Sequence, residues 1–326
     1  MKLGRNFTNL LYFDYLDAEN KRKFLAGELT VTDMDATVQT MAKKDIAKQV
    51  LTARALGIDH VELDGAVPNP YLAFSEEDKQ QAKAIARENN ISLSLHLPYS
   101  YVGASLCAPD ELDRKMAVSL QKRYIEFASD IGCKYCILHP GVVPFYHMNG
   151  KYLEQIRSNL IKSLAELASF AAEHDIDLHV ENNTAFDGLF SEPSEICEVL
   201  EKIWEMGLNV YFCFDIGHWL TRADAGKRAL NPPERVVEEI PNGLFKEVHL
   251  NDYVPGKRIF HPPLHLKLGL LGRENLERYL ERVVEKGAEV IVVETAASSW
   301  EHVIQRNEIL REETGYLKDI LGRFHA

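Results

Sequence analysis

The sequence predicts an α/β fold, a single (β/α)8 TIM barrel, and three observations support this prediction. Short apolar, β-branched runs alternate with longer segments of helical period along the chain, as in parallel sheets with crossover helices. The length of 326 residues lies within the range of one such barrel. No Gly-rich dinucleotide fingerprint follows the first strand, which favours a closed barrel over an open, doubly wound sheet.

Eight strands are expected in this barrel. The first, at residues 2–8, has the weakest pattern, and the others are expected at residues 60–65, 92–99, 135–141, 177–182, 210–218, 245–252 and 289–295. Apolar stripes at steps of three and four predict the helices between them, for example Ile156, Leu160, Leu164 and Leu167. Because no linker or repeat divides the chain, residues 1–326 are predicted to form one domain. The segment at about 9–44 does not fit the simple pattern and is interpreted as an elaborated first loop.

Composition and charge indicate a soluble globular protein and argue against nucleic-acid binding. Hydrophobic residues make up 46% and charged residues 26% of the chain. The formal net charge of −12 opposes binding to phosphate backbones. A local basic rim remains compatible with the sequence, because four cations gather in one stretch: Lys257, Arg258, Lys267 and Arg273.

The sequence predicts a cytoplasmic protein with reduced thiols. The first twenty residues lack the apolar run of a signal peptide, and no segment reaches the roughly 18 apolar residues of a membrane span. Five cysteines are an odd number in a large chain, unlike a secreted disulfide framework. The lone CxxC of Cys133 and Cys136 is interpreted as core packing and not as a zinc or redox motif.

Metal-capable side chains recur at the predicted ends of the strands, where TIM barrels carry their reactive groups. One such residue alone is usually a cap or a satisfied core group. A converging ring of them needs pairing or a metal ion to offset desolvation. Glu181, Asp215, His249 and Glu294 offer three carboxylates and one imidazole, which suits Mn²⁺, Mg²⁺, Co²⁺ or Zn²⁺ without selecting among them. A second metal site, or hydrogen bonds to substrate hydroxyls, is the role expected for His96, His139, His218 and His265.

Seven ordered motifs resemble those of the xylose-isomerase-like barrels, a superfamily that includes sugar phosphate isomerases and epimerases and the endonuclease IV group. The resemblance spans about residues 56–296 and rests on HLPY (96–99), HPG (139–141), ENN (181–183), DIGH (215–218), HLND (249–252), HLKLG (265–269) and VVET (292–295). In the isomerase branch it implies one metal on Glu181, Asp215, His249 and Glu294, with the two Glu acting as acid and base. In the endonuclease branch it implies three zinc ions held by these four together with His96, His139, His218 and His265.

One departure weighs against the endonuclease branch. The endonuclease pattern has an Asp two residues before the position matching His265, where this chain has Pro263, which offers no side-chain ligand. The Gly-x-Gly that normally follows is also altered, since two leucines separate Gly269 from Gly272. A three-metal cluster is therefore less well supported than a single metal.

These observations predict a metal-dependent isomerase or epimerase that acts on a sugar, a sugar phosphate or a related keto-polyol through an enediolate. Glu181 and Glu294 are expected to exchange the proton, and His218 and His96 to orient hydroxyls. Arg258 or Lys257 would contact a substrate phosphate or carboxylate, although a solvated loop charge is their commoner role. The alternatives are a multi-zinc phosphodiesterase or abasic-site endonuclease, a keto-polyol dehydratase, and a binding protein without catalysis. The sequence does not determine the sugar, the metal or the oligomeric state, and a homo-oligomer is compatible with it.

Overall fold

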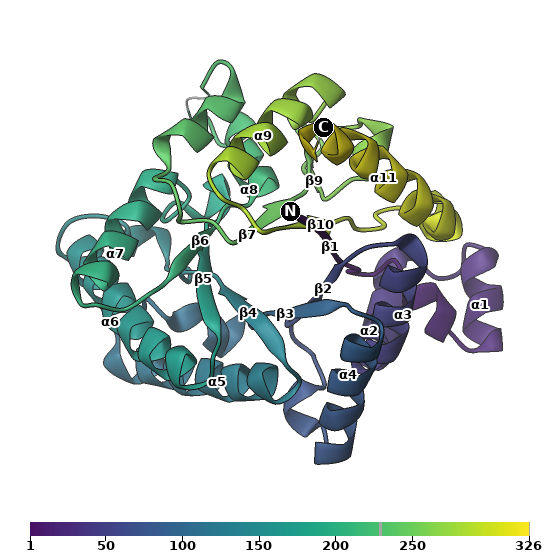
Figure 1. The fold of residues 1–326 in the computed structure, drawn as a ribbon, viewed down its shortest axis with the longest axis horizontal. Coiled ribbons are helices and arrows are strands. Elements are labelled where there is room, and N and C mark those ends of the chain that lie inside the picture. The colour runs from purple at the N-terminus through teal and green to yellow at the C-terminus, as the bar shows by residue number, and fades with distance from the viewer. Residues whose placement is uncertain (228–229, 326) are drawn as a thin grey trace.

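The computed structural model describes residues 1–227 and 230–325, and eight parallel strands form its centre (Figure 1). They are β1 (Lys2–Asn6), β2 (His60–Asp64), β3 (Ser92–His96), β4 (Cys133–Leu138), β5 (Asp177–Glu181), β6 (Tyr211–Cys213), β7 (Glu247–Leu250) and β10 (Val290–Glu294). Each predicted strand is confirmed, including the weak one at the amino terminus. A separate antiparallel hairpin consists of β8 (Tyr253–Val254) and β9 (Ile259–Phe260).

The sheet closes into a TIM barrel, as predicted. Its strand order is β6-β5-β4-β3-β2-β1-β10-β7, so that β6 and β7 stand at the two ends. These ends are joined by hydrogen bonds from Phe212 N to Leu244 O (2.9 Å) and from His249 N to Phe214 O (3.2 Å). The strand predicted to run to residue 218 ends at Cys213, because the Asp215 side chain accepts the His218 backbone N–H and starts a helix instead.

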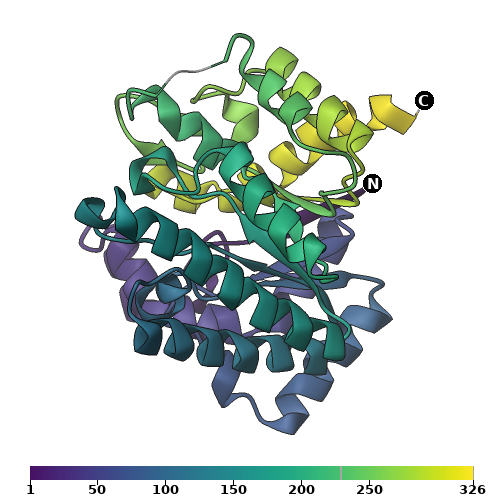
Figure 2. The same cartoon turned by 90° about the vertical axis from the view of Figure 1, so that its left-hand side faces the viewer.

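Helices surround the barrel on its outside (Figures 1 and 2). The α-helices are α1 (Ala18–Leu25), α2 (Val31–Lys44), α3 (Ile46–Leu56), α4 (Glu76–Glu88), α5 (Glu111–Asp130), α6 (Lys151–Glu173), α7 (Pro193–Glu205), α8 (Ile216–Leu220), α9 (Arg273–Glu285), α10 (Trp300–Ile304) and α11 (Arg306–Leu321). The short 3-10 helices are η1 (Tyr12–Tyr15), η2 (Tyr71–Ala73), η3 (Tyr101–Ser105), η4 (Phe145–His147), η5 (Ala185–Asp187), η6 (Thr221–Ala223), η7 (Pro233–Glu239), η8 (Leu264–Leu266) and η9 (Gly322–His325). The predicted apolar stripe of α6 is fully buried against the barrel.

The segment at about 9–44 contains η1, α1 and α2. The Asn9 side chain ties its start to the loop after β10, donating to Ala297 O (3.0 Å) and accepting from Ala297 N (2.8 Å). Near the end of α2, Lys43 is buried and donates to Ala66 O (2.5 Å) in the loop after β2. The segment therefore contacts the loops that follow two barrel strands.

Polar side chains line the barrel interior from the amino ends of β2 and β7 to the carboxyl ends of the strands. Alternate residues of a strand share one face, so His60, Glu62 and Asp64 of β2 all point inward. His60 meets Glu247 (3.2 Å) and Glu62 meets His249 (3.0 Å) across the barrel. Apolar packing completes the interior through Tyr135, Ile137, Cys213, Val290 and Val292.

Two further expectations concern thiols and membranes. All five cysteines are buried and free of disulfides. Among the residues that the structure describes, no helix has the length and apolar character needed to cross a membrane.

Candidate metal centre

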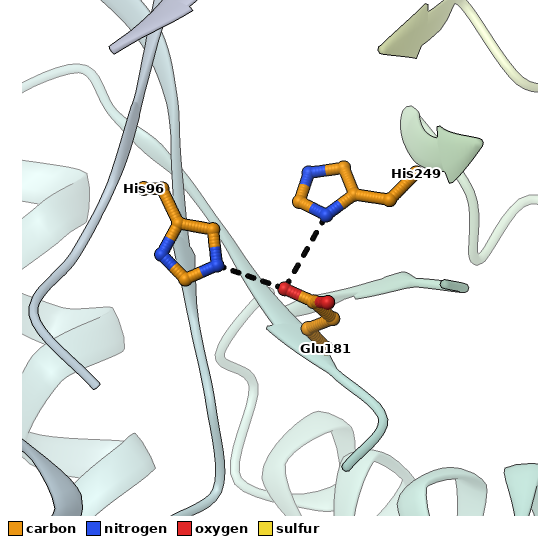
Figure 3. Close-up of side chains that lie close together, drawn as sticks. All are labelled: His96, Glu181 and His249. Atoms are coloured by element: carbon orange, nitrogen blue, oxygen red, sulfur yellow. Dashed lines mark hydrogen bonds and ion pairs between the residues drawn. The ribbon is translucent and has the colours of Figure 1, made fainter. Parts of the chain in front are cut away.

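Four imidazoles surround the carboxylate of Glu181 at the end of β5. Its Oε2 lies 3.0 Å from His96 Nε2, 3.3 Å from His139 Nε2 and 3.3 Å from His249 Nδ1. Its Oε1 lies 3.1 Å from His218 Nδ1. Figure 3 shows His96 and His249 pointing at this carboxylate from either side. Because these residues come from strand ends and loops around the barrel, the closed fold is what brings them together.

The other three predicted ligands converge on Nδ1 of His249. Besides Glu181, this atom lies 3.7 Å from Glu294 Oε1 and 4.0 Å from Asp215 Oδ2. It is fully buried and has no hydrogen-bond partner among the described residues. A buried imidazole nitrogen without a partner, facing three carboxylates, fits a divalent cation, because the cation would take the lone pair and offset the acidic charge.

Glu62 holds the other side of the His249 ring. Its Oε2 lies 3.0 Å from His249 Nε2, and its Oε1 accepts from Asn6 Nδ2 (3.0 Å). A carboxylate at Nε2 keeps the proton on that nitrogen and leaves the Nδ1 lone pair directed at the cluster. Neither Glu62 nor Asn6 was predicted as a site residue.

Two asparagines fix the carboxylates of the cluster. Asn251 Nδ2 donates to Asp215 Oδ2 (2.7 Å) and to Glu294 Oε2 (3.1 Å). Asn182 accepts from the Asp215 backbone N–H (2.8 Å) and donates to its carbonyl (3.1 Å). Gly217 is required beside them, since a Cβ there would lie 1.5 Å from Asn251 Oδ1. The DIGH and HLND motifs are therefore packed directly against each other.

The crowding of charges perturbs the two glutamates in opposite directions. Burial opposes ionisation of Glu181, but His139 and His249 outweigh it and hold the pKa of this carboxyl well below its usual range. Burial, together with the charges of Asp215 and Glu181, raises the pKa of Glu294 to about 8 despite the nearby His249. Without a cation, the site therefore disfavours simultaneous ionisation of Glu181, Asp215 and Glu294. Such mutual repulsion is expected at a site that binds a cation.

A cavity of about 150 Å³ opens above the cluster at the carboxyl ends of the strands. Its lining combines predicted site residues with others on β1 and β2 and in the segments that follow β1, β3 and β9: Asn6, Thr8, Asp64, His96, Tyr99, His139, Glu181, His218, His261 and Glu294. Tyr99 contacts the His96 and His139 rings, with centroids 5.0 and 5.1 Å away. Asp215 and His249 lie below this surface and are fully buried.

His265 is the one predicted site residue that the structure does not bring to the cluster. It lies on η8, where its Nε2 is 3.5 Å from Glu312 on α11. His261, four residues earlier, lines the cavity instead, with Nδ1 3.9 Å from Glu294 Oε2. The sequence placed two histidines in one irregular loop, and no periodic pattern there indicates which one faces inward.

The basic stretch lies outside the cavity lining. Arg258 is exposed and its guanidinium stacks on the Phe186 ring at 4.9 Å, while Lys257 is exposed beside it. Glu62 carried a usable sequence signal, because a carboxylate between the apolar residues Val61 and Leu63 of a buried strand needs a partner. Asn251 had one too, as part of the HLND motif.

Comparisons with known proteins agree with this geometry. The profile of a family described as xylose isomerase-like TIM barrel matches residues 50–320. The uncharacterized protein MJ1311 of Methanocaldococcus jannaschii is 27% identical over 224 residues, which cover 68% of this chain and 70% of the relative.

Solved structures show the same architecture. D-psicose 3-epimerase with D-tagatose from Clostridium cellulolyticum H10 superposes with a TM-score of 0.65 over 98% of both chains at 15% identity. A xylose isomerase-like TIM barrel protein from Mycobacterium smegmatis in complex with magnesium has a TM-score of 0.55 over 83% of this chain and 89% of the other, at 16% identity. At such identities these superpositions establish the fold.

Proposed function

Because the chain belongs to the xylose isomerase-like TIM barrel family, we propose that it is a metal-dependent sugar isomerase or epimerase. One observation carries the proposal. Glu181 and Glu294 line the same cavity, and each places a carboxylate oxygen within 3.7 Å of His249 Nδ1. Two carboxylates beside a nitrogen that could bind a cation are suited to remove and return a proton on the carbon next to a carbonyl group.

The residues that would hold the cation are Glu181, Asp215, His249 and Glu294. Their oxygen-rich donor set is compatible with Mn²⁺, Mg²⁺, Co²⁺ and Zn²⁺. Such a cation supplies Lewis-acid polarisation of the substrate carbonyl and so acidifies the neighbouring C–H. The superposed Mycobacterium smegmatis structure, described as a complex with magnesium, supports a divalent ion in this fold.

The protein itself contributes the proton transfer and the orientation of the substrate. Glu181 on β5 and Glu294 on β10 are separated by β6 and β7 in the closed barrel, so they reach the cavity from different sides. One glutamate removes the C–H proton, and the other returns a proton to the resulting enediolate. Return to the opposite face of the same carbon inverts that carbon, and return to the neighbouring carbon moves the carbonyl group. His96 and His218 line the same cavity and can orient hydroxyls.

A ketose is the substrate that the superpositions favour. The superposed Clostridium cellulolyticum structure is a ketose 3-epimerase with a ketose present. By analogy, the exchanged proton is the one on the carbon next to the ketone. The analogy supports the substrate class, whereas the proposed proton transfer is argued from the positions of Glu181 and Glu294.

Solvent-proton exchange tests this function. Protein loaded separately with each of the four metals is incubated in D₂O with D-fructose, D-tagatose and D-psicose, and NMR follows deuterium uptake next to the carbonyl. We expect metal-dependent uptake that falls by about 10²- to 10⁴-fold in Glu181→Gln and Glu294→Gln. Glu308→Gln, an exposed position on α11, is the matched control. Uptake that is absent with every metal, or undiminished in Glu294→Gln, would refute the proposal.

One observation favours a second function, a phosphodiester hydrolase with several metals. His96 and His139 both lie within 3.3 Å of Glu181 Oε2, and these residues belong to the larger ligand set of the endonuclease branch. Elemental analysis separates the two functions. About three zinc ions per chain with cleavage of abasic DNA would favour the hydrolase, and one divalent ion per chain favours the epimerase.

A further inference from the structure

The wall of the cavity at the carboxyl ends of β1 and β2 supplies none of the proposed metal ligands. It consists of Asn6, Thr8 and Asp64. Asp64 stands on β2, which lies four strands from β6 and Asp215 in either direction around the barrel. Asp64 is also the register partner of His96 on β3, so it reaches the mouth at the same height as the cluster. A substrate held at the metal centre would extend toward this wall.

Asp64 is a fixed carboxylate. Its Oδ1 accepts from Ala66 N (2.8 Å), and its Oδ2 lies 3.1 Å from Lys43 Nζ. Lys43 also donates to Ala66 O (2.5 Å), and its side chain is only 4% exposed. The Asp64 side chain keeps 21% of its surface exposed and lines the cavity. Because each carboxylate oxygen accepts more than one hydrogen bond, Asp64 retains acceptor capacity toward a ligand.

Thr8 stands beside Asp64 in a strained backbone conformation. Its φ is +48°, which a β-branched residue rarely adopts, and its N–H donates to Asn6 Oδ1 (3.0 Å). The Thr8 hydroxyl has no hydrogen bond to any described residue and belongs to the cavity lining. This arrangement offers a ligand one further donor and acceptor next to the carboxylate.

No ammonium or guanidinium group stands among the described residues of the cavity lining to bind a phosphate. Among its ten described residues there is no Lys or Arg, whereas Asp64, Glu181 and Glu294 are acidic. The imidazoles of His96, His139 and His218 already lie within 3.3 Å of Glu181. A phosphate at the Asp64 wall would meet a carboxylate of like charge, while a hydroxyl would find an acceptor.

We propose that Asp64 and Thr8 form a hydroxyl-binding subsite that limits the substrate to uncharged polyhydroxy carbonyl compounds and excludes their phosphate esters. The inference rests on the proposed function, because it takes the reacting end of the substrate to lie at the metal centre. Thr8 and Lys43 lie outside residues 50–320, the part that matches the family. Asp64, the carboxylate of the subsite, lies within the part that matches.

Binding and turnover together test the subsite. Calorimetry on the metal-loaded protein gives Kd for D-fructose and for its 1- and 6-phosphates, and the exchange assay gives KM and kcat. We expect the free sugar to bind at least about 10-fold more tightly than either ester. Asp64→Ala is expected to raise KM for the free sugar by about 10- to 100-fold with kcat within about threefold, as for a lost hydrogen bond to a charged group.

Three variants make the test specific. Asp64→Asn keeps the shape of the side chain and removes its charge, so it should reduce the difference in Kd between the phosphate esters and the free sugar. Thr8→Val should raise KM for the free sugar without changing that difference in Kd. This variant tests the subsite even if Asp64→Ala does not fold. Asp35→Asn, on α2 but outside the cavity lining, is the control. It should leave both KM for the free sugar and the difference in Kd unchanged.

The outcomes separate this inference from the proposed function. Esters that bind as tightly as the free sugar overturn the subsite, whether or not proton exchange occurs. A free sugar that binds with the expected dependence on Asp64 but exchanges no proton supports the subsite and refutes the epimerase. Failure of both free sugar and esters to bind overturns both.

Discussion

Glu62 is predicted to control metal affinity although it lies beneath the ligands. It is fully buried, and both of its oxygens accept a hydrogen bond, from His249 Nε2 (3.0 Å) and Asn6 Nδ2 (3.0 Å). In Glu62→Gln one oxygen becomes an NH₂ group and faces a donor. Asn6 cannot flip to compensate, since its Oδ1 already accepts from Thr8 N (3.0 Å). The substitution thus removes a charge and leaves one donor opposite another.

The size of the effect follows from the position of Glu62. Carboxylates that hold the second nitrogen of a metal-binding imidazole typically contribute about 10- to 100-fold in affinity. In excess metal this loss lowers the metal-dependent stabilisation by about 1.4–2.7 kcal/mol. Glu247→Gln is the matched control, because Glu247 is equally buried but accepts from Ser94 Oγ (3.1 Å), lies 3.2 Å from His60 Nε2 and stays 3.7 Å from His249 Nε2.

Titration calorimetry with Mn²⁺, supported by thermal unfolding with and without the metal, measures this prediction. We expect Kd to rise about 10- to 100-fold in Glu62→Gln and less than about threefold in Glu247→Gln. A Kd for Glu62→Gln within twofold of the unmodified protein, while Glu181→Gln loses binding, would show that Glu62 does not hold the ring.

Three further predictions follow from the same structure. Chelation of the metal should lower the free energy of unfolding by about 2.7 kcal/mol relative to protein at a metal concentration of 100 times Kd, measured by denaturant titration. Burial raises the pKa of Asp35 to about 6, so ionisation at higher pH opposes folding and the stability associated with this group falls as pH rises from about 4 through 6. Asp35→Asn should therefore raise Tm at pH 8 and have little effect at pH 4 in scanning calorimetry. His261→Ala should raise KM for the substrate, whereas His265→Ala should leave kcat/KM within about twofold; equal losses in both would contradict the placement of the loop.

The strands could be predicted because their chemistry is local. Apolar, β-branched runs ending in a polar residue identify buried parallel strands, and even the weak run at residues 2–8 forms β1. The closure of β6 on β7 and the meeting of Glu181, Asp215, His249 and Glu294 followed from the barrel prediction, because its strand ends share one face.

The loops could not be predicted in the same way. The helix after β6 starts at Ile216 because the Asp215 side chain caps it, so a run that looked like one long strand is a strand and a helix. The choice between His261 and His265 depends on the β8–β9 hairpin and on the ion pair of His265 with Glu312, which lies 47 positions away. Such long-range contacts leave no periodic signal in the sequence.

The charges inside the barrel predict that folding is coupled to cation binding. Glu62 and Glu247 approach His249 Nε2 from below, and Glu181, Glu294 and Asp215 approach Nδ1 from above. Five buried carboxylates around one imidazole cost considerable desolvation and repulsion, which apolar residues of similar volume would avoid. The lower pair is partly offset by His60, Ser94 and Asn6, but the upper three share a histidine nitrogen without a hydrogen bond. A divalent ion would offset the upper group, and we therefore expect the charge that would make the site reactive to make the stability of the fold depend on the ion.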